Sequence, residues 1–407
     1  CLVTAFWIPY FVAYFPGVYW YDTSWQLMEY YDPSVPFTDH HPFMMTYLYV
    51  GFAHIGKALF NNAIYGLYLL VLVQSLLSTL AIACTVCYTG KYNILWKCRF
   101  FIAVFLTFFP IIPMMSMSLA KDTFNTPFFV FFSIAFSELW RTQGTILKSV
   151  SFDVFFIADA LAVSLTKKTG MYIIVLALLL LACFVVKHWS YKIATIVLGG
   201  VPYLVVGIIV PTFILPALHI APGESNEILA VPMQQVANVV HNHKDDLSIA
   251  EIDEIAGWGG LSVAWFSFNV ASGEEQDLSM MRPINNSKHH YQNIEQYMPW
   301  TDNTKAGNAI GQFYADTLSA TPILNIIWQK AFWATILPFA IMFLILRSKK
   351  NKLNLLMLNL PIFITMLVLF AGPISTHTEA TRYVLPMLYI IPLFLPLTLK
   401  HLQPKEF

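Results

Sequence analysis

Long runs of apolar residues, separated by short polar segments, recur along most of the chain. A run of roughly 20 apolar residues is long enough for a helix to cross the hydrocarbon core of a bilayer. The chain begins inside such a run, so we expect residues to precede Cys1. The runs predict ten membrane-spanning helices, the first of them cut short, at residues 1–15, 62–88, 99–118, 124–140, 152–166, 171–187, 193–217, 326–346, 353–371 and 383–399.

Composition agrees with this pattern. Apolar residues make up 57% of the chain and charged residues only 11%, and the mean hydropathy is +0.61. A soluble protein of 407 residues would need more polar surface than so few charged side chains provide. The formal net charge is zero, so no basic surface for nucleic acid is expected. The predicted fold class is therefore an all-α polytopic membrane protein.

Lysine and arginine predict the orientation of the spans. They occupy alternate loops, and the positive-inside rule places such loops in the cytoplasm. This puts two segments outside: the first loop, residues 16–61, and the longest loop, residues 218–325. The loop and terminal cations assigned to the cytoplasm are Lys91, Lys97, Arg99, Arg141, Lys148, Lys187, Lys192, Arg347, Lys349, Lys350, Lys352, Lys400 and Lys405.

The same pattern divides the chain into three regions. Residues 1–217 are expected to form an N-terminal transmembrane module that includes the first external loop (16–61). Residues 218–325 are expected to form an external region, and residues 326–407 are expected to form the C-terminal transmembrane helices. The external region is expected to contain short amphipathic helices, because Ser248 and Glu251 form a capping box and Gly257 follows as a helix terminator. The five cysteines lie outside the external segments, so no disulfide framework is expected.

Polar residues collect in the external segments where helices emerge. Charges at such depths cost free energy unless they pair or face water, so they are candidates for a functional site. The first loop has Asp22, Gln26, Glu29, Asp32, Asp39, His40 and His41; later external turns have Lys121, Asp122, Lys167, Lys168, His377, Glu379 and Arg382.

Each of these residues also has a simpler interpretation. Asp22 or Asp39 can cap a helix, and the lysines can extend to the membrane interface. His40 and His41 can bind metal, but adjacent histidines lack the spacing of a zinc pair on a helix, so no metal ligand set is predicted. Several cations together on the external face instead indicate an anionic ligand such as a phosphate.

Five motifs resemble a family of known fold. "PGVYWYDTSWQL" and "DHHPFMMTYLYVGFAHIG" look like the first-loop signature of a bacterial branch of membrane glycosyltransferases with the GT-C fold. "LAKDTFNTPFF", "TKKTGMY" and "RYVLPMLYIIPL" resemble the later motifs of that branch in the same order, so the resemblance spans nearly the whole chain. The residues before Gly170, Lys-Lys-Thr, differ from the Arg-Asn-Asn type of the branch.

The resemblance implies a GT-C-like bundle in the bacterial plasma membrane with its active face extracytoplasmic. It implies an inverting transfer of sugar from a polyprenyl-phosphate donor to an extracytoplasmic glycan, lipid or protein. Asp22, with Asp39 as second choice, would be the general base or orient the acceptor. Arg382, Lys121 and Lys167 or Lys168 would stabilise the leaving phosphate. The further candidates for substrate binding are Gln26, His40, His41, Asp122, Glu379 and Tyr383. No cofactor is specified, and a divalent metal ion stays open.

Other functions fit part of the pattern. A transporter or flippase of lipid-linked saccharides would place binding groups near the midplane, within repeated halves. The chain has no internal repeat, and Asp153 and Asp159 are its main mid-helix charges. A glycan polymerase or ligase would share the donor class. A non-catalytic sensor or assembly protein would account for the long loop but not for the converging charges. The transferase is the favoured hypothesis.

Overall fold

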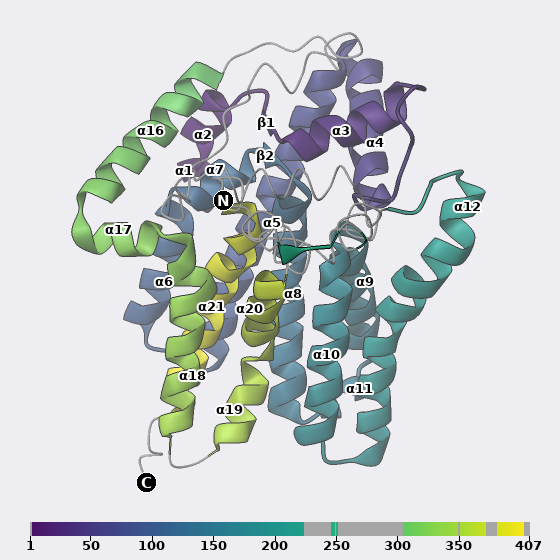
Figure 1. Cartoon of the computed structure of the whole chain (residues 1–407). Helices are drawn as coiled ribbons and strands as arrows, with labels where there is room; N and C mark the ends of the chain where they lie inside the picture. The colour runs from purple at the N-terminus through teal and green to yellow at the C-terminus, as the bar shows by residue number, and fades with distance from the viewer. Residues whose placement is uncertain are drawn as a thin grey trace.

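The computed structural model describes residues 2–223, 246–248, 250, 304–348, 351–371 and 381–402. In this part of the chain helices dominate, and two strands of two residues each are present (Figure 1). The predicted all-α fold class is confirmed. The helices of the N-terminal part are α1 (Leu2–Phe6), α2 (Ile8–Ala13), α3 (Tyr21–Tyr31), α4 (Phe43–Phe60), α5 (Ala63–Lys91), α6 (Trp96–Phe108), α7 (Ile111–Ser116), α8 (Lys121–Thr142), η1 (Thr145–Lys148), α9 (Val150–Thr166), α10 (Lys168–Phe184), α11 (Trp189–Pro202), η2 (Tyr203–Ile214) and α12 (Leu215–Ala217).

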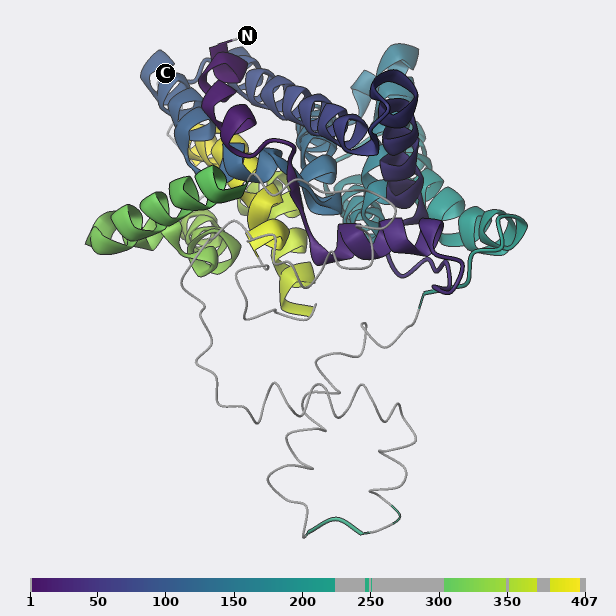
Figure 2. The ribbon, with the colours of Figure 1, turned by 90° about the horizontal axis from the view of Figure 1, so that it is seen from above.

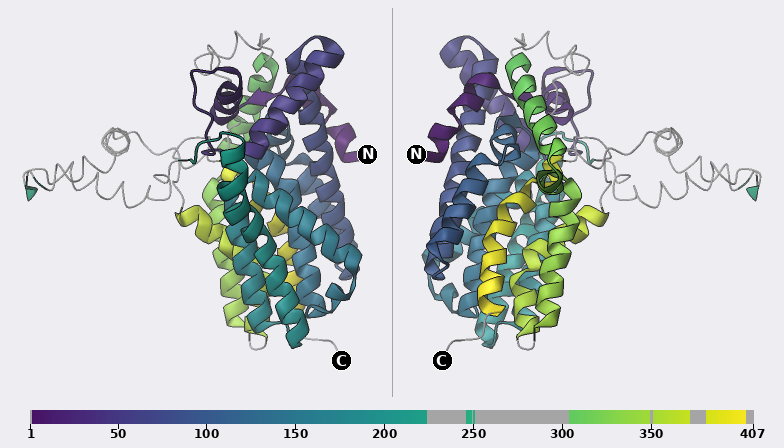
Figure 3. Two further views of the ribbon diagram at one scale, coloured as in Figure 1. Left: turned by 90° about the vertical axis from the view of Figure 1, so that its right-hand side faces the viewer. Right: turned by 90° about the vertical axis from the view of Figure 1, so that its left-hand side faces the viewer.

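The C-terminal helices complete the bundle. Figure 3 shows α9 to α11 on one side of the molecule and α16 to α19 on the other. Helix α8 packs against α5, α9 and α21, and aromatic residues such as Phe132 and Tyr389 fill the space between them. The C-terminal helices are α16 (Thr304–Ala320), α17 (Pro322–Trp328), η6 (Phe332–Ile336), α18 (Leu337–Arg347), α19 (Lys352–Leu358), α20 (Leu360–Ala371) and α21 (Thr381–Leu402).

Fewer helices than predicted have the length and apolar composition of a membrane span. Among the described residues three do: α5, the continuous helix Trp189–Ala217, and α21. Two bent pairs, Pro322–Trp328 with Phe332–Arg347 and Lys352–Leu358 with Leu360–Phe370, raise the number to five if each pair is one span. The count of ten stays a prediction.

The remaining predicted spans coincide with helices that are shorter or more polar. The segment 99–118 is divided between α6 and α7, and residues 1–15 are divided between α1 and α2. Helix α8 is long, but it buries polar side chains such as Asn125, Ser133 and Ser137. Because Ser133 and Ser137 bond to the carbonyl oxygens four residues earlier, they require no external partner.

The outside of the bundle is apolar. Phe101, Val150, Trp189, Phe213 and Phe343 each expose more than half of their surface, and they come from five different elements. Such extensive exposed apolar surface is costly in water and is suited to contact with lipid.

The two ends of the bundle differ in their chemistry. At one end Glu138 pairs with Lys91 (2.9 Å) and Arg141 (2.6 Å), and Lys400 donates to the carbonyl oxygen of Tyr92. These cations were all assigned to the cytoplasmic side from the sequence. The opposite end, seen from above in Figure 2, contains α3 and the first turns of α8, α10 and α21.

A pair of short parallel strands fixes the geometry of this opposite end. β1 (Val18–Tyr19) pairs with β2 (Ser118–Leu119), with Val18 opposite Ser118 and Tyr19 opposite Leu119. Helix α5 supports the second strand, because the Gln74 side chain donates to the carbonyl oxygens of Ser116 and Ser118 at 2.9 and 2.8 Å. Each strand is followed almost at once by a helix, so the starts of α3 and α8 lie side by side.

Candidate functional site

The strand pair brings Asp22 close to Lys121. Asp22 lies in the first turn of α3, and Lys121 and Asp122 lie in the first turn of α8. The Thr23 hydroxyl donates to the carbonyl oxygen of Leu119, and the Trp20 indole donates to the Ser118 hydroxyl, so both residues bind α3 to β2. Charged side chains from two distant parts of the sequence are thereby held together.

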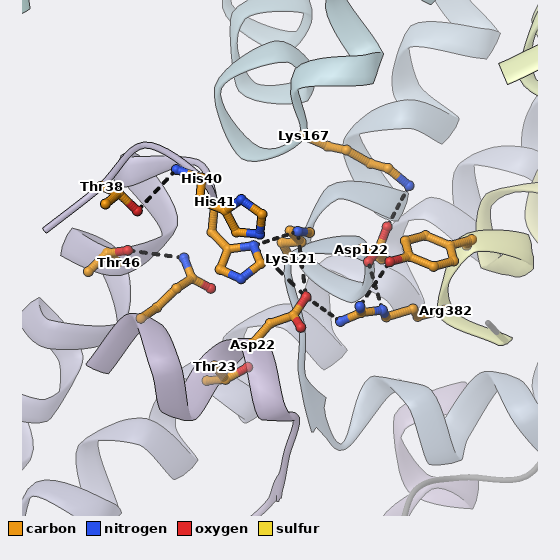
Figure 4. A network of polar contacts seen from close by, with 12 residues as sticks. Asp22, Thr23, Thr38, His40, His41, Thr46, Lys121, Asp122, Lys167 and Arg382 are labelled. Atoms are coloured by element: carbon orange, nitrogen blue, oxygen red, sulfur yellow. Dashed lines mark hydrogen bonds and ion pairs between the residues drawn. The ribbon is translucent and has the colours of Figure 1, made fainter. Parts of the chain in front are cut away.

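Three side chains surround the Asp22 carboxylate (Figure 4). Its Oδ2 accepts a hydrogen bond from Arg382 Nη1 at 2.5 Å and lies 3.5 Å from Lys121 Nζ. His41 Nδ1 is 4.0 Å away, and the same nitrogen is 2.8 Å from Lys121 Nζ. Since the Lys121 ammonium can only donate, His41 Nδ1 is the acceptor of that bond.

The charges set the protonation states of these groups. Burial raises the pKa of the Asp22 carboxyl, but Lys121 and Arg382 lower it by more, so the net pKa lies below the usual range. Burial and the adjacent Lys121 lower the pKa of His41 to about 3, which makes its ring neutral near pH 7. A neutral ring agrees with Nδ1 accepting a hydrogen bond from Lys121. The 4.0 Å approach of His41 to Asp22 is therefore not an ion pair.

Arg382 lies at the start of α21 and is almost completely buried, with 6% of its surface exposed. Its guanidinium packs over the rings of Trp20 (5.3 Å) and Tyr383 (4.9 Å), and its Nη2 donates to the Tyr383 hydroxyl at 2.9 Å. On its other side, Arg382 Nε lies 3.8 Å from Asp122 Oδ2. The aromatic rings and two carboxylates thus hold one guanidinium in place.

Asp122 connects this arginine to α10. Its carboxylate is fully buried, and its Oδ1 accepts from Lys167 Nζ at 2.5 Å. The Asn125 amide positions Lys167, because it donates to Val163 O and Thr166 Oγ1, both at 2.8 Å, at the end of α9. Residue 170 must be glycine, since a Cβ there would lie 2.6 Å from Val163 Cγ1.

The "DHHP" segment forms the neighbouring ion pair. Asp39 Oδ2 lies 2.8 Å from Lys168 Nζ, and Lys168 also donates to the Asp39 carbonyl oxygen. Asp39 Oδ1 accepts from the Phe43 backbone N–H at 3.3 Å, at the start of α4. Asp39 therefore pairs with a cation and also accepts a hydrogen bond from the first residue of α4, although the N-cap of this helix is Pro42 and not Asp39.

We refer to these seven charged residues as the ion cluster: Asp22, Asp39, Lys121, Asp122, Lys167, Lys168 and Arg382. It has four cations and three carboxylates. The helix starts of α3, α8, α10 and α21 meet here, and helix N-termini carry partial positive charge. The cluster as a whole favours an anion.

A pocket of about 310 Å³ lies beside the ion cluster, lined by Trp25, Glu29, Pro36, Thr38, His40, His41 and Pro222. Glu29 is 4% exposed, and its Oε1 accepts from the Thr38 hydroxyl at 2.7 Å. Burial raises the pKa of the Glu29 carboxyl, although Thr38, Trp25 and His40 offset part of the shift. His41 belongs to both the pocket and the surroundings of Asp22, so the two sites are contiguous.

The structure brings together most of the predicted site residues. Asp22, His41, Lys121, Asp122, Lys167, Arg382 and Tyr383 surround one point, with Asp39, His40 and Lys168 beside it. Gln26 is buried, and its amide donates to Thr46 Oγ1 at 3.0 Å between α3 and α4. Three predictions fall outside the described residues: the site residue Glu379, the capping-box residue Glu251, and the amphipathic helices expected within 224–245 and 251–303.

Two contributors, Asn125 and Trp20, were not predicted as site residues, and Glu29 was predicted only as one of the polar candidates in the first loop, without an assigned role. Glu29 follows Asp22 by two helical turns, a spacing that places both on one face of α3. Asn125 lies one turn after Lys121 in α8. Trp20 precedes α3 by one residue, and no simple pattern singles it out. Within the described ranges, no group of three or more His, Cys, Asp or Glu side chains is arranged to hold a metal ion.

Comparison with known proteins gives one result at the level of family. Residues 3–257, more than half of the chain, match the model of a family of unknown function, DUF6020. The chain belongs to this family. The DUF6020 match includes every member of the ion cluster except Arg382, which lies beyond it. No curated protein and no solved structure matches the chain.

Proposed function

We propose that this protein is an inverting membrane glycosyltransferase that moves a sugar from a polyprenyl-phosphate donor to an extracytoplasmic acceptor hydroxyl. The observation that supports this best is the position of the ion cluster. Arg382 and Lys121 converge on Asp22, and a pocket that His41 also lines lies beside them. An anion site beside a pocket of this size offers places for a phosphate donor and a hydroxyl acceptor.

The cations suit a leaving phosphate. When the bond between the anomeric carbon and the phosphate oxygen breaks, negative charge develops on that oxygen. Arg382 and Lys121 are held by Trp20, Tyr383 and Asp22 before substrate binds, so they require little rearrangement to stabilise the charge. In this scheme the low pKa of Asp22 keeps it ionised, and its main task is to position the two cations.

The surface of the bundle supports a lipid-linked donor. Its exterior is apolar, and the ion cluster lies at the end opposite the Lys91–Glu138–Arg141 group. By the positive-inside rule the latter end faces the cytoplasm and the ion cluster faces outward. A polyprenyl chain can then stay in the membrane while its phosphate reaches the starts of α8 and α21.

The test uses the full chain in proteoliposomes with undecaprenyl-phosphate-linked mannose, glucose and galactose, each radiolabelled in the sugar. We expect transfer or slow hydrolysis from one of these donors. Arg382→Ala and Lys121→Ala should each lower donor use by roughly 10-fold to 100-fold, because one charge-assisted hydrogen bond contributes about 1.5–3 kcal/mol.

Arg141→Ala is the matched control. It removes a cation paired with Glu138 at the other end of α8, so donor use should stay as in the wild type. Normal donor use by both site variants would contradict the phosphate assignment. Movement of intact donor across the bilayer without transfer of its sugar would instead favour a flippase.

A further inference from the structure

We infer that Glu29 is the general base of the transfer, and that the pocket it lines binds the acceptor through a carbohydrate hydroxyl. This rests on the proposed function, and it assigns the proton transfer to a residue outside the ion cluster. Asp22 then keeps the role of positioning Arg382 and Lys121.

The geometry of Glu29 points to a ligand. The residue is 4% exposed, its Oε1 is bonded to Thr38, the Trp25 side chain also interacts with the carboxyl group, and no donor among the described residues reaches hydrogen-bond geometry at Oε2. A buried carboxylate oxygen without a donor carries a desolvation cost, so such atoms in native proteins call for an explanation. Because Glu29 lines the pocket, a hydroxyl bound there can supply the missing donor.

The other lining residues suit a sugar better than an anion or an apolar ligand. Trp25 offers an aromatic face on which the C–H side of a pyranose can stack, and Thr38 and His40 offer polar groups. The described residues that line the pocket include a carboxylate and no lysine or arginine, so they disfavour a second phosphate. Its volume of about 310 Å³ lies at the lower end of the range for small-ligand sites.

Asp22 is less suited to take a proton. Its carboxylate is shared between Arg382 at 2.5 Å and Lys121 at 3.5 Å, and these cations lower its pKa. Burial shifts the pKa of Glu29 in the opposite direction, toward the working pH, where a general base is most effective.

His41 lies at the boundary between the proposed acceptor pocket and the proposed phosphate site. Its ring lines the pocket, while its Nδ1 accepts a hydrogen bond from Lys121. A sugar in the pocket and a phosphate at Lys121 would therefore lie on either side of one imidazole. The acceptor oxygen and the anomeric carbon of the donor can meet there.

The reaction follows from these positions. The acceptor hydroxyl gives its proton to Glu29 Oε2, and the oxygen forms a bond to the anomeric carbon. The bond from that carbon to the phosphate oxygen breaks, and its electron pair leaves with polyprenyl phosphate beside Arg382 and Lys121. Glu29 then releases the proton to water.

The first experiment is steady-state kinetics in the proteoliposome assay. Glu29→Gln should lower kcat by roughly 100-fold or more, as for loss of a general base, with the donor KM within about twofold of wild type. Formate should restore part of the turnover of Glu29→Ala but not of Glu29→Gln, in which the amide fills the site. Asp32→Asn, at the far end of α3 and bonded to Ser34, is the control and should keep normal turnover.

The second experiment needs no turnover. Saturation-transfer NMR with free mannose, glucose and galactose should detect a sugar on the wild type, and Trp25→Ala and Glu29→Ala should lose the signal. Turnover of Glu29→Gln within threefold of wild type would overturn the base assignment. Sugar binding that survives both substitutions, or is undetectable in the wild type, would overturn the pocket. A wild type that binds sugar but transfers none would refute the proposed function and the base role, and would leave the pocket standing.

Discussion

The carboxylate of Asp22 and the guanidinium of Arg382 meet at 2.5 Å, although 360 positions of sequence separate the two residues. Asp22 lies in the first turn of α3, and Arg382 lies in the first turn of α21, the last described helix. Because Arg382 is buried and also packs on Trp20, this pair ties the two parts of the bundle together at the site.

Asp22→Asn should lower stability as well as activity. The substitution leaves Arg382 and Lys121 without their shared counter-charge, and breaking a buried ion pair costs about 3–5 kcal/mol. Thermal denaturation in detergent should show a clear fall in the midpoint. Donor KM should rise, because the cations lose their positioning group, whereas a Glu29 variant should change kcat alone.

Asp32→Asn again provides the control. Asp32 bonds to Ser34 rather than to a cation, so the denaturation midpoint should stay close to that of the wild type. Equal midpoints for the Asp22 and Asp32 variants would show that the ion pairs of Asp22 do not stabilise the fold.

Lys167 and Lys168 should behave differently although they are adjacent. Lys167→Met removes the partner of the fully buried Asp122 and should cost about 3–5 kcal/mol. The Lys168 side chain is 43% exposed, so Lys168→Met should cost about 1 kcal/mol or less. The double variant Lys167→Met/Asp122→Asn should recover part of the loss. Equal losses for the two single lysine variants would contradict the described burial of Asp122.

His41 should make the protein sensitive to mild acid. Its pKa is lowered from 6.5 to about 3 in the folded state, so the unfolded chain takes up its proton first. The stability from the neutral ring is fully present above pH 6.5 and is lost as the pH falls toward 3. At pH 5 the loss should be about 2 kcal/mol.

His41→Asn should flatten this dependence, because an amide oxygen can accept the bond from Lys121 without titrating. The groups that influence His41 are Lys121, Asp22, His40 and Arg382, and Asp22 should lose its own contribution only below about pH 4, as its lowered pKa requires. Denaturation midpoints measured between pH 4.5 and 7.5 test the difference. An unchanged slope in His41→Asn would assign the acid sensitivity to another group.

The orientation of the bundle can be tested by labelling. After replacement of the native cysteines, Ser34→Cys, beside the site end, should react with a membrane-impermeant thiol reagent in intact cells. Ser190→Cys, in the first turn of α11 on the side assigned to the cytoplasm, should react only after permeabilisation. The reverse pattern would place the ion cluster on the cytoplasmic side and contradict a donor site on the outer face.

Hydropathy predicted the helical class. The distribution of lysine and arginine predicted which loops lie at the same end of the bundle. The division of residues 99–118 into α6 and α7 was less accessible, because the proline-containing segment after Phe108 stays apolar while its backbone turns. The number of spans also depends on tertiary packing. Helix α8 buries Asn125 and Ser133 against its neighbours, and an isolated segment with these residues does not read as a strong span.

Most residues of the ion cluster could be predicted, because charged residues are rare in this chain and each one is therefore informative. Which cation pairs with which carboxylate could not be predicted. Asp122 was expected to bind substrate, yet it is fully buried against Lys167, and Gln26 bonds to Thr46 between helices. Glu29 was one of several acidic residues in the first loop, and only the fold shows that its second oxygen lacks a partner.

The strand pair that joins residues 18–19 to residues 118–119 also has a consequence for the order of assembly during synthesis. A ribosome delivers Asp22 first, then the strand that carries Lys121 to it, then Lys167 and Lys168, and Arg382 much later. Asp22 therefore acquires a first cationic partner early, before the guanidinium that finally neutralises it has been made. Until α21 has been made, Asp22 lacks its guanidinium partner, so the ion cluster is completed only with the last described helix.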